Sequence, residues 1–107
     1  MHSRESIQLI AQRIAAAASS PAKVILFGSY ARGNANESSD VDILVLQKQF
    51  DNRGEEYLRL ATEAHKIIRN VDVVLMKQED FEWKSMVGGT LPFWAKQEGV
   101  VLHDGQP

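Results

Sequence analysis

The chain has 107 residues, of which 44% are hydrophobic, so we expect one core and a single domain over residues 1–107. Twelve Lys and Arg against fourteen Asp and Glu give a formal charge of −2, which disfavours direct binding of nucleic acid. Cysteine is absent, which excludes disulfides and thiolate metal sites. The sequence shows no signal-peptide pattern and no apolar run near the ~20 residues of a membrane helix, so we expect a cytoplasmic protein with no membrane contact.

The first part of the chain predicts a helix, a buried strand and a short helix. Apolar residues recur at helical spacing from Arg4 to Ala18, which indicates an amphipathic helix. Val24 to Phe27 is a continuous apolar run that stops at Gly28, as in a buried strand. Ser29 then suits the N-cap of a short helix.

A polar loop separates this unit from a second strand and a second long helix. Residues 33–39 are rich in Gly, Asn and Ser, which favour turns, and Val41 to Leu46 is apolar enough for a strand. An acidic turn then begins a helix. We expect its apolar face to carry Tyr57, Leu60, Ala61, Ala64, Ile67 and Ile68.

The last third predicts a strand, two short helices and a final strand. Val71 to Met76 reads as a strand, and residues 77–85 as a short helix or turn. A Gly pair at 88–89 is a predicted hinge, after which Thr90 caps a helix that ends near Gly99. Val100 to His103 is the last predicted strand. Alternating helices and strands indicate the α/β class.

Two strands begin with aspartates. Side chains alternate between the faces of a strand, so Asp40 and Asp42 point the same way, while Val41, Ile43 and Val45 point to the other face. Asp72 repeats the arrangement at the start of the next predicted strand. If the two strands are neighbours, about 4.8 Å apart, the three carboxylates form one cluster.

Such a cluster needs a positive partner. Two charges ~5 Å apart at an effective dielectric of ~20 repel by roughly 3 kcal/mol. Mg²⁺ takes oxygen ligands and keeps bonds to waters and substrate phosphates, so the aspartates suit a metal platform for phosphoryl or nucleotidyl transfer. Each aspartate considered separately is more typical of a turn or a helix cap; only their joint pattern favours the metal.

A Gly-Ser pair stands twelve residues upstream of Asp40 and adds a site for an anion. Gly28 lets a phosphate approach the main chain, and the amides and hydroxyl that begin with Ser29 can donate to it. The P-loop lysine and the G-x-G-x-x-G pattern are both missing, so the other common phosphate-binding motifs do not compete.

The segments GSYARG, SDVDILV and VDVVLM together resemble the polymerase-beta-like nucleotidyltransferase superfamily, whose motif is Gly-Ser, about ten residues, Asp-x-Asp and a third Asp on a later strand. Ten residues separate Ser29 from Asp40 here. The chain is similar in size to the minimal nucleotidyltransferases, which pair with a HEPN protein as the antitoxin of a toxin–antitoxin module. The resemblance implies a palm-like fold with a small mixed sheet flanked by helices.

The resemblance also implies the roles of individual residues. Asp40 and Asp42 would bind two Mg²⁺ ions, and Asp72 would help to hold the catalytic ion and activate the acceptor hydroxyl. Gly28 and Ser29 would hold the triphosphate of ATP. Two roles are possible for Arg32. It lies one helical turn from Ser29 and can reach a phosphate, or it pairs with a nearby carboxylate such as that of Glu37.

The implied reaction is transfer of AMP from ATP to a tyrosine hydroxyl of a cognate HEPN RNase toxin, which silences the toxin. Larger family members have an added acceptor-binding domain, for which this chain has no room, so we expect the partner to supply the acceptor. Two alternative functions remain. In one, the chain neutralises its partner by binding alone; in the other, it modifies a hydroxyl of a small molecule.

Several other residues are given structural roles. We expect His65 to be a solvated residue on a helix face, and His2 and His103 to lack metal-ligand spacing. Ser39 is expected to be a turn serine rather than a group that orients Asp40. The aromatic and Met residues after the third strand are expected to pack in the core or to cover the sheet, with partner contact as the alternative; they are Trp83, Met86, Phe93 and Trp94.

Overall fold

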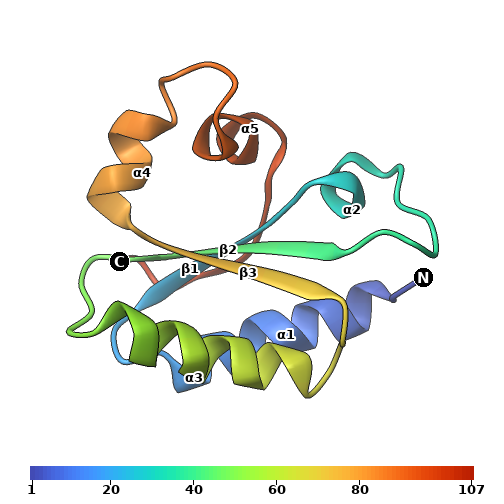
Figure 1. Cartoon of the computed structure of the whole chain (residues 1–107), viewed down its shortest axis with the longest axis horizontal. Coiled ribbons are helices and arrows are strands. Elements are labelled where there is room, and N and C mark those ends of the chain that lie inside the picture. The colour runs from blue at the N-terminus through green and yellow to red at the C-terminus, as the bar shows by residue number, and fades with distance from the viewer.

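The computed structural model describes residues 1–107 as four strands and five helices (Figure 1). The strands are β1 (Ala22–Phe27), β2 (Val41–Gln47), β3 (Val71–Lys77) and β4 (Val100–Asp104). The helices are α1 (Arg4–Ala17), α2 (Ser29–Arg32), α3 (Arg53–His65), α4 (Gln78–Lys84) and α5 (Leu91–Glu98). No helix is both long enough and apolar enough to cross a membrane.

The four strands form one mixed sheet in the order β3-β2-β1-β4. Strand β1 is antiparallel to both β2 and β4, whereas β2 and β3 are parallel neighbours. This confirms the predicted mixed sheet. It also meets the condition on which the carboxylate cluster depends, because two parallel neighbours begin at the same edge of the sheet.

Helices cover the two faces of the sheet unequally (Figure 1). Helices α1 and α3 lie along one face, where the inward side chains of the strands, such as Val41 and Ile43, join a core cluster of 17 buried residues. Helices α4 and α5 lie over the other face, where Leu44 and Leu46 join a smaller cluster of four. Residues of even number in β2 therefore point to the second face, and Asp42 is among them.

The ends of the helices follow local side-chain chemistry in most cases. Ser3, Asn52 and Thr90 each accept a hydrogen bond from a main-chain N–H in the first turn of α1, α3 and α5, as the sequence predicts for Thr90. The predicted N-cap at Ser29 is wrong. Gly28 is the N-cap of α2 and Ser29 is its first helical residue, because only glycine readily adopts the φ of 75° found there.

Helix α3 differs from its prediction in length and in its buried face. It ends at His65, so Ile67 and Ile68 lie in the turn beyond it, although Ile68 is still buried. Tyr57, which was expected on the apolar face, is 41% exposed. Glu56 is buried in its place, a position that no hydrophobic pattern can predict.

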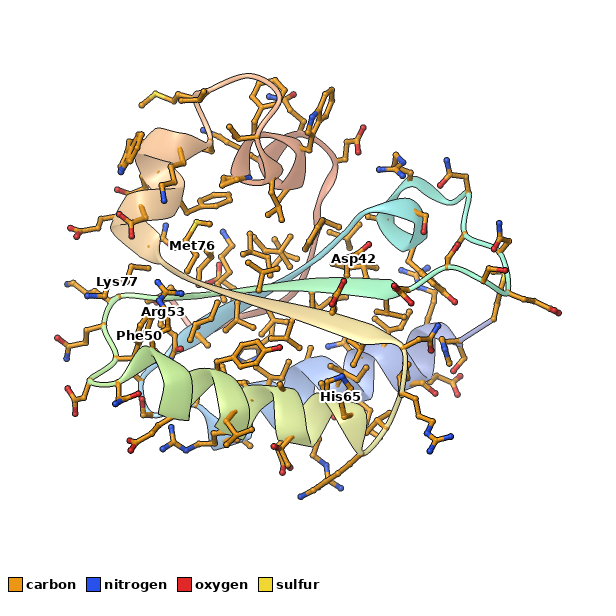
Figure 2. The ribbon with its side chains drawn as sticks, viewed as in Figure 1. Asp42, Phe50, Arg53, His65, Met76 and Lys77 are labelled. Carbon is orange, nitrogen blue, oxygen red and sulfur yellow. The ribbon has the colours of Figure 1, made fainter.

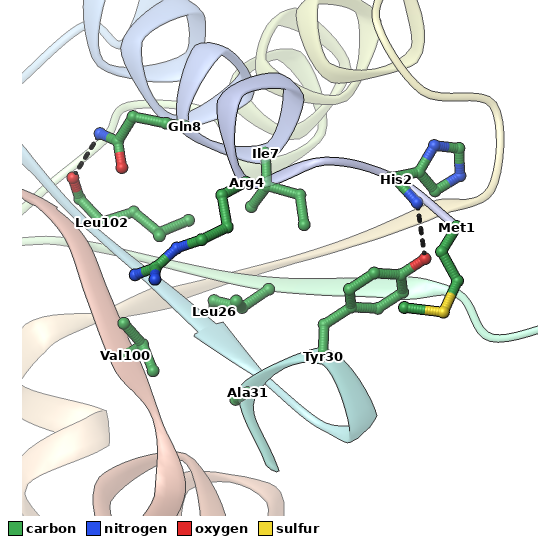
Figure 3. Close-up of a pocket in the computed structure, with 10 residues that line it drawn as sticks. All are labelled: Met1, His2, Arg4, Ile7, Gln8, Leu26, Tyr30, Ala31, Val100 and Leu102. Atoms are coloured by element: carbon green, nitrogen blue, oxygen red, sulfur yellow. Dashed lines mark hydrogen bonds between the residues drawn. The ribbon is translucent and has the colours of Figure 1, made fainter. Parts of the chain in front are cut away.

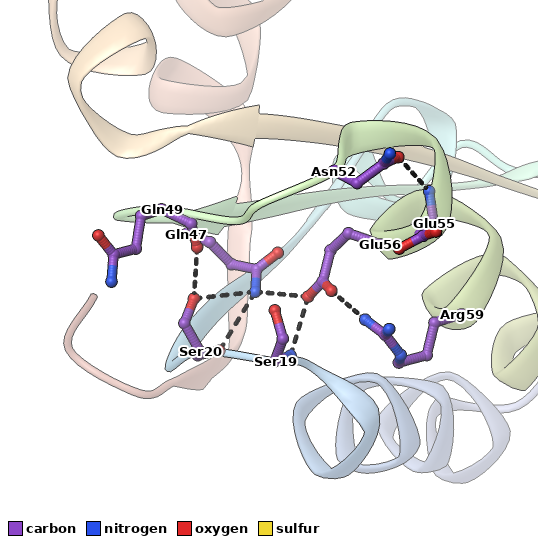
Figure 4. A network of polar contacts seen from close by, with 8 residues as sticks. All are labelled: Ser19, Ser20, Gln47, Gln49, Asn52, Glu55, Glu56 and Arg59. Carbon is purple, nitrogen blue, oxygen red and sulfur yellow. Dashed lines mark hydrogen bonds and ion pairs between the residues drawn. The ribbon is translucent and has the colours of Figure 1, made fainter.

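The carboxylate of Glu56 joins the ends of three elements (Figure 4). Its Oε2 accepts hydrogen bonds from the Ser19 main-chain N–H, 2.9 Å away, and from the Gln47 side-chain amide, 2.8 Å away. Arg59 forms an ion pair with Oε1. Gln47 also donates to the main-chain oxygen of Ser20, so the network joins the turn after α1, the end of β2 and the start of α3.

Arg53, in the first turn of α3, supports the β3 edge of the sheet (Figure 2). Its guanidinium donates to the main-chain oxygen of Leu75 at 2.6 Å and lies over the ring of Phe50, 5.1 Å from the centroid. A charged side chain at this position satisfies one of the strand's carbonyls and makes the edge less open to pairing with another chain.

We expect Glu56→Gln to lower the free energy of unfolding at pH 7 by about 2 kcal/mol, because a charged acceptor of buried hydrogen bonds is lost. Burial raises the pKa of Glu56, but the hydrogen bonds from Ser19 and Gln47 and the charge of Arg59 lower it more, so the pKa lies below its ordinary value of 4.5. A lowered pKa means stability that is present above pH 4.5 and is lost as the pH falls through the folded value. Urea unfolding at pH 7 and about pH 3 measures both effects.

The matched control is Glu63→Gln on the same helix. Glu63 pairs with the exposed side chain of Lys66, so its loss should change stability far less. Equal effects of the two substitutions at pH 7 would contradict a structural role for the Glu56 network.

Candidate active site

Parallel pairing of β2 with β3 places two of the predicted carboxylates side by side. Asp42 and Asp72 are partners in the strand register, one pair along from Val41 and Val71. On its other side Asp42 pairs with Phe27, the last residue of β1. Asp40 is exposed and lies one residue before the start of β2. The strands therefore bring together Asp42 and Asp72, and the chain just before β2 carries Asp40 to the same end of the sheet.

Gly28 lies directly against Asp42 of this pair. A Cβ atom at Gly28 would lie against the Asp42 carboxylate, with the Asp42 Cγ only 3.1 Å away. The main-chain oxygen of Gly28 accepts from the N–H groups of Ala31 and Arg32, which starts α2 beside the carboxylates. Two local features therefore require glycine at this position, its positive φ and the space that Asp42 occupies. Gly28 thus places the Gly-Ser segment beside the Asp-x-Asp segment.

The charges of Asp72 and Asp40 both act on the carboxylate of Asp42. Burial raises the pKa of Asp42, and the negative charges of Asp72 and Asp40 raise it further. The positive charge of Arg32 lowers the pKa of Asp42 and partly offsets these effects. A carboxyl whose ionised form is disfavoured in this way is typical of sites that receive a cation.

Arg32 is paired in the structure, but not with the predicted residue. Its Nη1 lies 3.4 Å from the Glu98 Oε2 at the end of α5, and both side chains are partly exposed. The alternative in which Arg32 pairs with a carboxylate therefore describes the structure, but the partner is Glu98 and not the suggested Glu37. Glu98 follows Arg32 by 66 residues, so no local pattern indicates the contact. An exposed pair of this kind is weak, which leaves the guanidinium able to turn toward another anion.

The side chains fit a divalent cation through their chemistry rather than through a preformed cage. No group of three or more His, Cys, Asp or Glu residues is arranged to hold a metal ion by itself. Mg²⁺ does not require such a cage, because it commonly binds one or two carboxylates and completes its shell with waters and phosphate oxygens. The paired carboxylates of Asp42 and Asp72, with their mutual repulsion, provide that partial set.

A comparison with protein families decides the assignment. The model of the family described as polymerase beta, nucleotidyltransferase, matches residues 10–91. The chain belongs to this nucleotidyltransferase family. The matched range contains the Gly-Ser pair, Asp40, Asp42 and Asp72, so the segments that carried the resemblance in the sequence lie inside it.

Two relatives from Methanocaldococcus jannaschii carry the name "Putative protein adenylyltransferase". One is 36% identical over 75 residues, which is 59% of this chain and 46% of the relative. Another is 42% identical over 59 residues, which is 50% of this chain and 56% of the relative. The chain thus spans about half the length of the curated relatives it matches.

Solved structures support the nucleotidyltransferase fold. A crystal structure of a toxin–antitoxin with AMP-PNP superposes with a TM-score of 0.65 and 20% identity, covering 94% of this chain and 74% of the other. At that identity the likeness concerns the fold. It agrees with the mixed sheet and with the placement of helices on both of its faces.

The other residues singled out in the sequence lie outside the carboxylate cluster. His65 is exposed, as predicted, but its Nε2 also donates to the main-chain oxygen of Val71 at 3.0 Å. Ser39 accepts from the Asn36 main-chain N–H, which makes it a turn serine. A pocket of about 390 Å³ beside α2 includes none of the three aspartates (Figure 3).

The residues after β3 do not form the expected core. Trp83, Met86 and Trp94 have exposed fractions of 54%, 73% and 49%, so the prediction of core packing is wrong for them, while Phe93 is half-buried. Helices α4 and α5 are short and bury only smaller parts of their surface, chiefly through Ala95. The exposed residues form what we call the α4–α5 patch; its members are Trp83, Met86, Val87, Leu91 and Trp94.

Asp42→Asn should stabilise the protein at pH 7. Because the fold raises the pKa of Asp42, the folded state holds that proton more tightly than the unfolded chain, and ionised Asp42 destabilises the fold above the folded pKa. Screening of the half-buried side chain limits the gain to on the order of 1 kcal/mol or less. Urea unfolding should show this gain at pH 7 and none near pH 3. Glu37→Gln, in the exposed loop, controls for net charge, and a destabilised Asp42→Asn would contradict the repulsion.

Gly28 and Gly33 share a positive φ but differ in their surroundings. Gly28 and Gly33 have φ values of 75° and 80°, so alanine at either position should cost at least about 1 kcal/mol of backbone strain. Only at Gly28 does the new methyl group displace Asp42, because Gly33 has open space around it. Calorimetric titration with ATP and Mg²⁺ should show binding lost in Gly28→Ala and kept in Gly33→Ala. Equal binding by the two variants would argue against the contact.

Proposed function

We propose that this chain is a Mg²⁺-dependent nucleotidyltransferase that transfers AMP from ATP to a tyrosine hydroxyl of a cognate HEPN RNase toxin and thereby acts as its antitoxin. The observation that carries the proposal is the register pair of Asp42 with Asp72, with Gly28 against it. Carboxylates and the glycine that begins α2 thus occur together at one end of the sheet. That combination suits a metal-bound triphosphate.

Independent findings support parts of this proposal. Family membership supports nucleotidyl transfer as the reaction class. The relatives named as protein adenylyltransferases support AMP as the group and a protein as the acceptor. The similar fold in a toxin–antitoxin with AMP-PNP supports an adenine nucleotide and a toxin partner. The tyrosine and the HEPN identity of the toxin rest on the resemblance of the sequence motifs to the minimal nucleotidyltransferases.

The reaction forms one bond and breaks one. The acceptor oxygen bonds to the α-phosphorus of ATP, the bond from that phosphorus to the bridging oxygen breaks, and pyrophosphate leaves. The acceptor proton passes to the carboxylate of Asp72, which stands beside Asp42 in the register. Two bound Mg²⁺ ions would supply charge stabilisation for the attacking and leaving oxygens.

The remaining residues of the site hold the donor. Asp40 and Asp42 would bind the metal ions, and their charge repulsion would be relieved when the ions arrive. The first N–H groups of α2, at Ser29 and Tyr30, together with the Ser29 hydroxyl, would donate to phosphate oxygens. Arg32 would leave its exposed pair with Glu98 to contact the same phosphates.

The α4–α5 patch supports a protein as the acceptor. Its residues belong to α4, α5 and the segment between them, and these two helices lie over the face of the sheet to which Asp42 points (Figure 1). Helix α5 also contacts α2 through the pair of Glu98 with Arg32. Exposed Trp and Met side chains are frequent in protein interfaces. The patch also favours the second candidate function, in which the chain neutralises its partner by binding alone.

One experiment separates the two functions. The chain, the partner encoded beside it, Mg²⁺ and ATP labelled at the α-phosphate are mixed, and label on the partner is measured with the RNase activity that survives. Wild type should label and silence the partner. Asp40→Asn combined with Asp42→Asn should still form the complex but lower labelling by more than the roughly 10- to 100-fold that loss of an outer-shell metal contact costs.

The outcomes are distinct. Glu37→Gln, which removes an exposed carboxylate from the loop before β2, is the matched control and should label normally. No label from the wild type would overturn the enzymatic proposal. Silencing of the partner by the double variant, without label, would favour neutralisation by binding.

A further inference from the structure

Asn70, the residue just before β3, makes three contacts that meet near Asp40. Its side-chain Nδ2 donates to the main-chain oxygen of Ser39 at 2.9 Å. Its own main-chain oxygen accepts from the N–H of Val41, also at 2.9 Å. Ser39 and Val41 flank Asp40 on either side, so Asn70 holds the main chain directly before and directly after that aspartate.

The contact is needed because Asp40 lies outside the sheet. The register of β2 with β3 begins at Val41, so ladder hydrogen bonds do not hold the segment before it. Strand ends that lack such bonds are among the least stable parts of a fold. Before Asp40, the Asn70 side chain at Ser39 therefore ties this segment to the one that bears Asp72, and after Asp40 the Asn70 main-chain oxygen does so at Val41.

The third contact extends this link to α2. The Asn70 Oδ1 lies 2.7 Å from the His2 Nε2, and since the Asn70 amide nitrogen faces Ser39, the imidazole is the donor. The main-chain N–H of His2 in turn donates to the Tyr30 hydroxyl at 3.1 Å (Figure 3). Tyr30 belongs to α2, the element that begins at Gly28 and Ser29.

We propose that Asn70 is a positioning residue for the metal–nucleotide site, and that His2 and Tyr30 extend its hold to α2. The inference rests on the proposed function, because it assumes that Asp40, Asp72 and α2 share one metal-bound triphosphate. Asn70 touches none of these groups through their reacting atoms. It sets the distance between the segments that carry them, and groups that bind a metal together lose affinity when such supports are removed.

The test uses Mn²⁺ with ATP as the probe. Mn²⁺ replaces Mg²⁺ in oxygen-ligand sites and reports its binding by electron paramagnetic resonance without any turnover. Asn70→Ala should weaken binding of the Mn²⁺–ATP complex about tenfold, at the lower end of the range for outer-shell contacts. His2→Ala keeps Asn70 and its contacts to the Asp40 segment, so it should give a smaller loss in the same direction.

The matched control is Asn52→Ala. Asn52 caps α3, with its side chain 3.0 Å from the Glu55 N–H, at the other end of the fold. Its removal should lower stability in urea comparably to Asn70→Ala but leave Mn²⁺–ATP affinity within about twofold of wild type. If Asn70 had only a structural role, the affinity for Mn²⁺–ATP would fall together with the stability in urea in both variants.

Each result bears on a different claim. No binding of the Mn²⁺–ATP complex by the wild type would overturn the proposed function. Wild-type affinity in Asn70→Ala would overturn the positioning role and leave the proposed function standing. If Asn70→Ala does not fold, His2→Ala decides the question, and unchanged affinity in that variant would overturn the inference.

Discussion

Burial of apolar side chains beneath β2 and β3 holds Asp42 beside Asp72 against the repulsion of their charges. The pair formed by Asp42 and Asp72 exists because β2 and β3 run parallel and in register. Their repulsion is overcome by burial on the other face, where Val41, Ile43 and Val71 belong to the large core cluster. The apolar half of each strand thus holds its acidic residues together, although those residues would separate in an unfolded chain.

The two faces of the sheet therefore differ in how they are covered and in the side chains they carry. One face is closed by α1 and α3 and is tied at its far end by the buried carboxylate of Glu56. Helices α4 and α5 lie over the other face, and Asp42 lies on that face at the end near α2 (Figure 2). Glu56 and Asp42 show the contrast within one protein. Hydrogen bonds and Arg59 lower the pKa of Glu56, whereas burial and like charges raise the pKa of Asp42.

The sequence was informative where the chemistry is local. The Gly-Ser pair, the Asp-x-Asp spacing and the alternation of β2 depend on neighbours in the chain, and the family match covers them. Contacts between distant segments could not be predicted, as with Glu98 at Arg32 and Asn70 at Ser39. Hydrophobicity alone misplaced Tyr57, which is exposed on α3, and it gave the wrong result where it favoured core packing of Trp83, Met86 and Trp94.

An acidic site of this kind links stability to occupancy. The carboxylates weaken the unliganded fold, since the raised pKa of Asp42 reports a charge that the folded state disfavours at neutral pH. Under the proposed function a bound cation would reverse the sign, because it would favour the ionised form and bind only when the strands are paired. The repulsion that weakens the free fold and the proposed affinity for a metal-bound triphosphate would then have one origin. The core beneath β2 and β3 is what keeps Asp42 and Asp72 side by side against that repulsion.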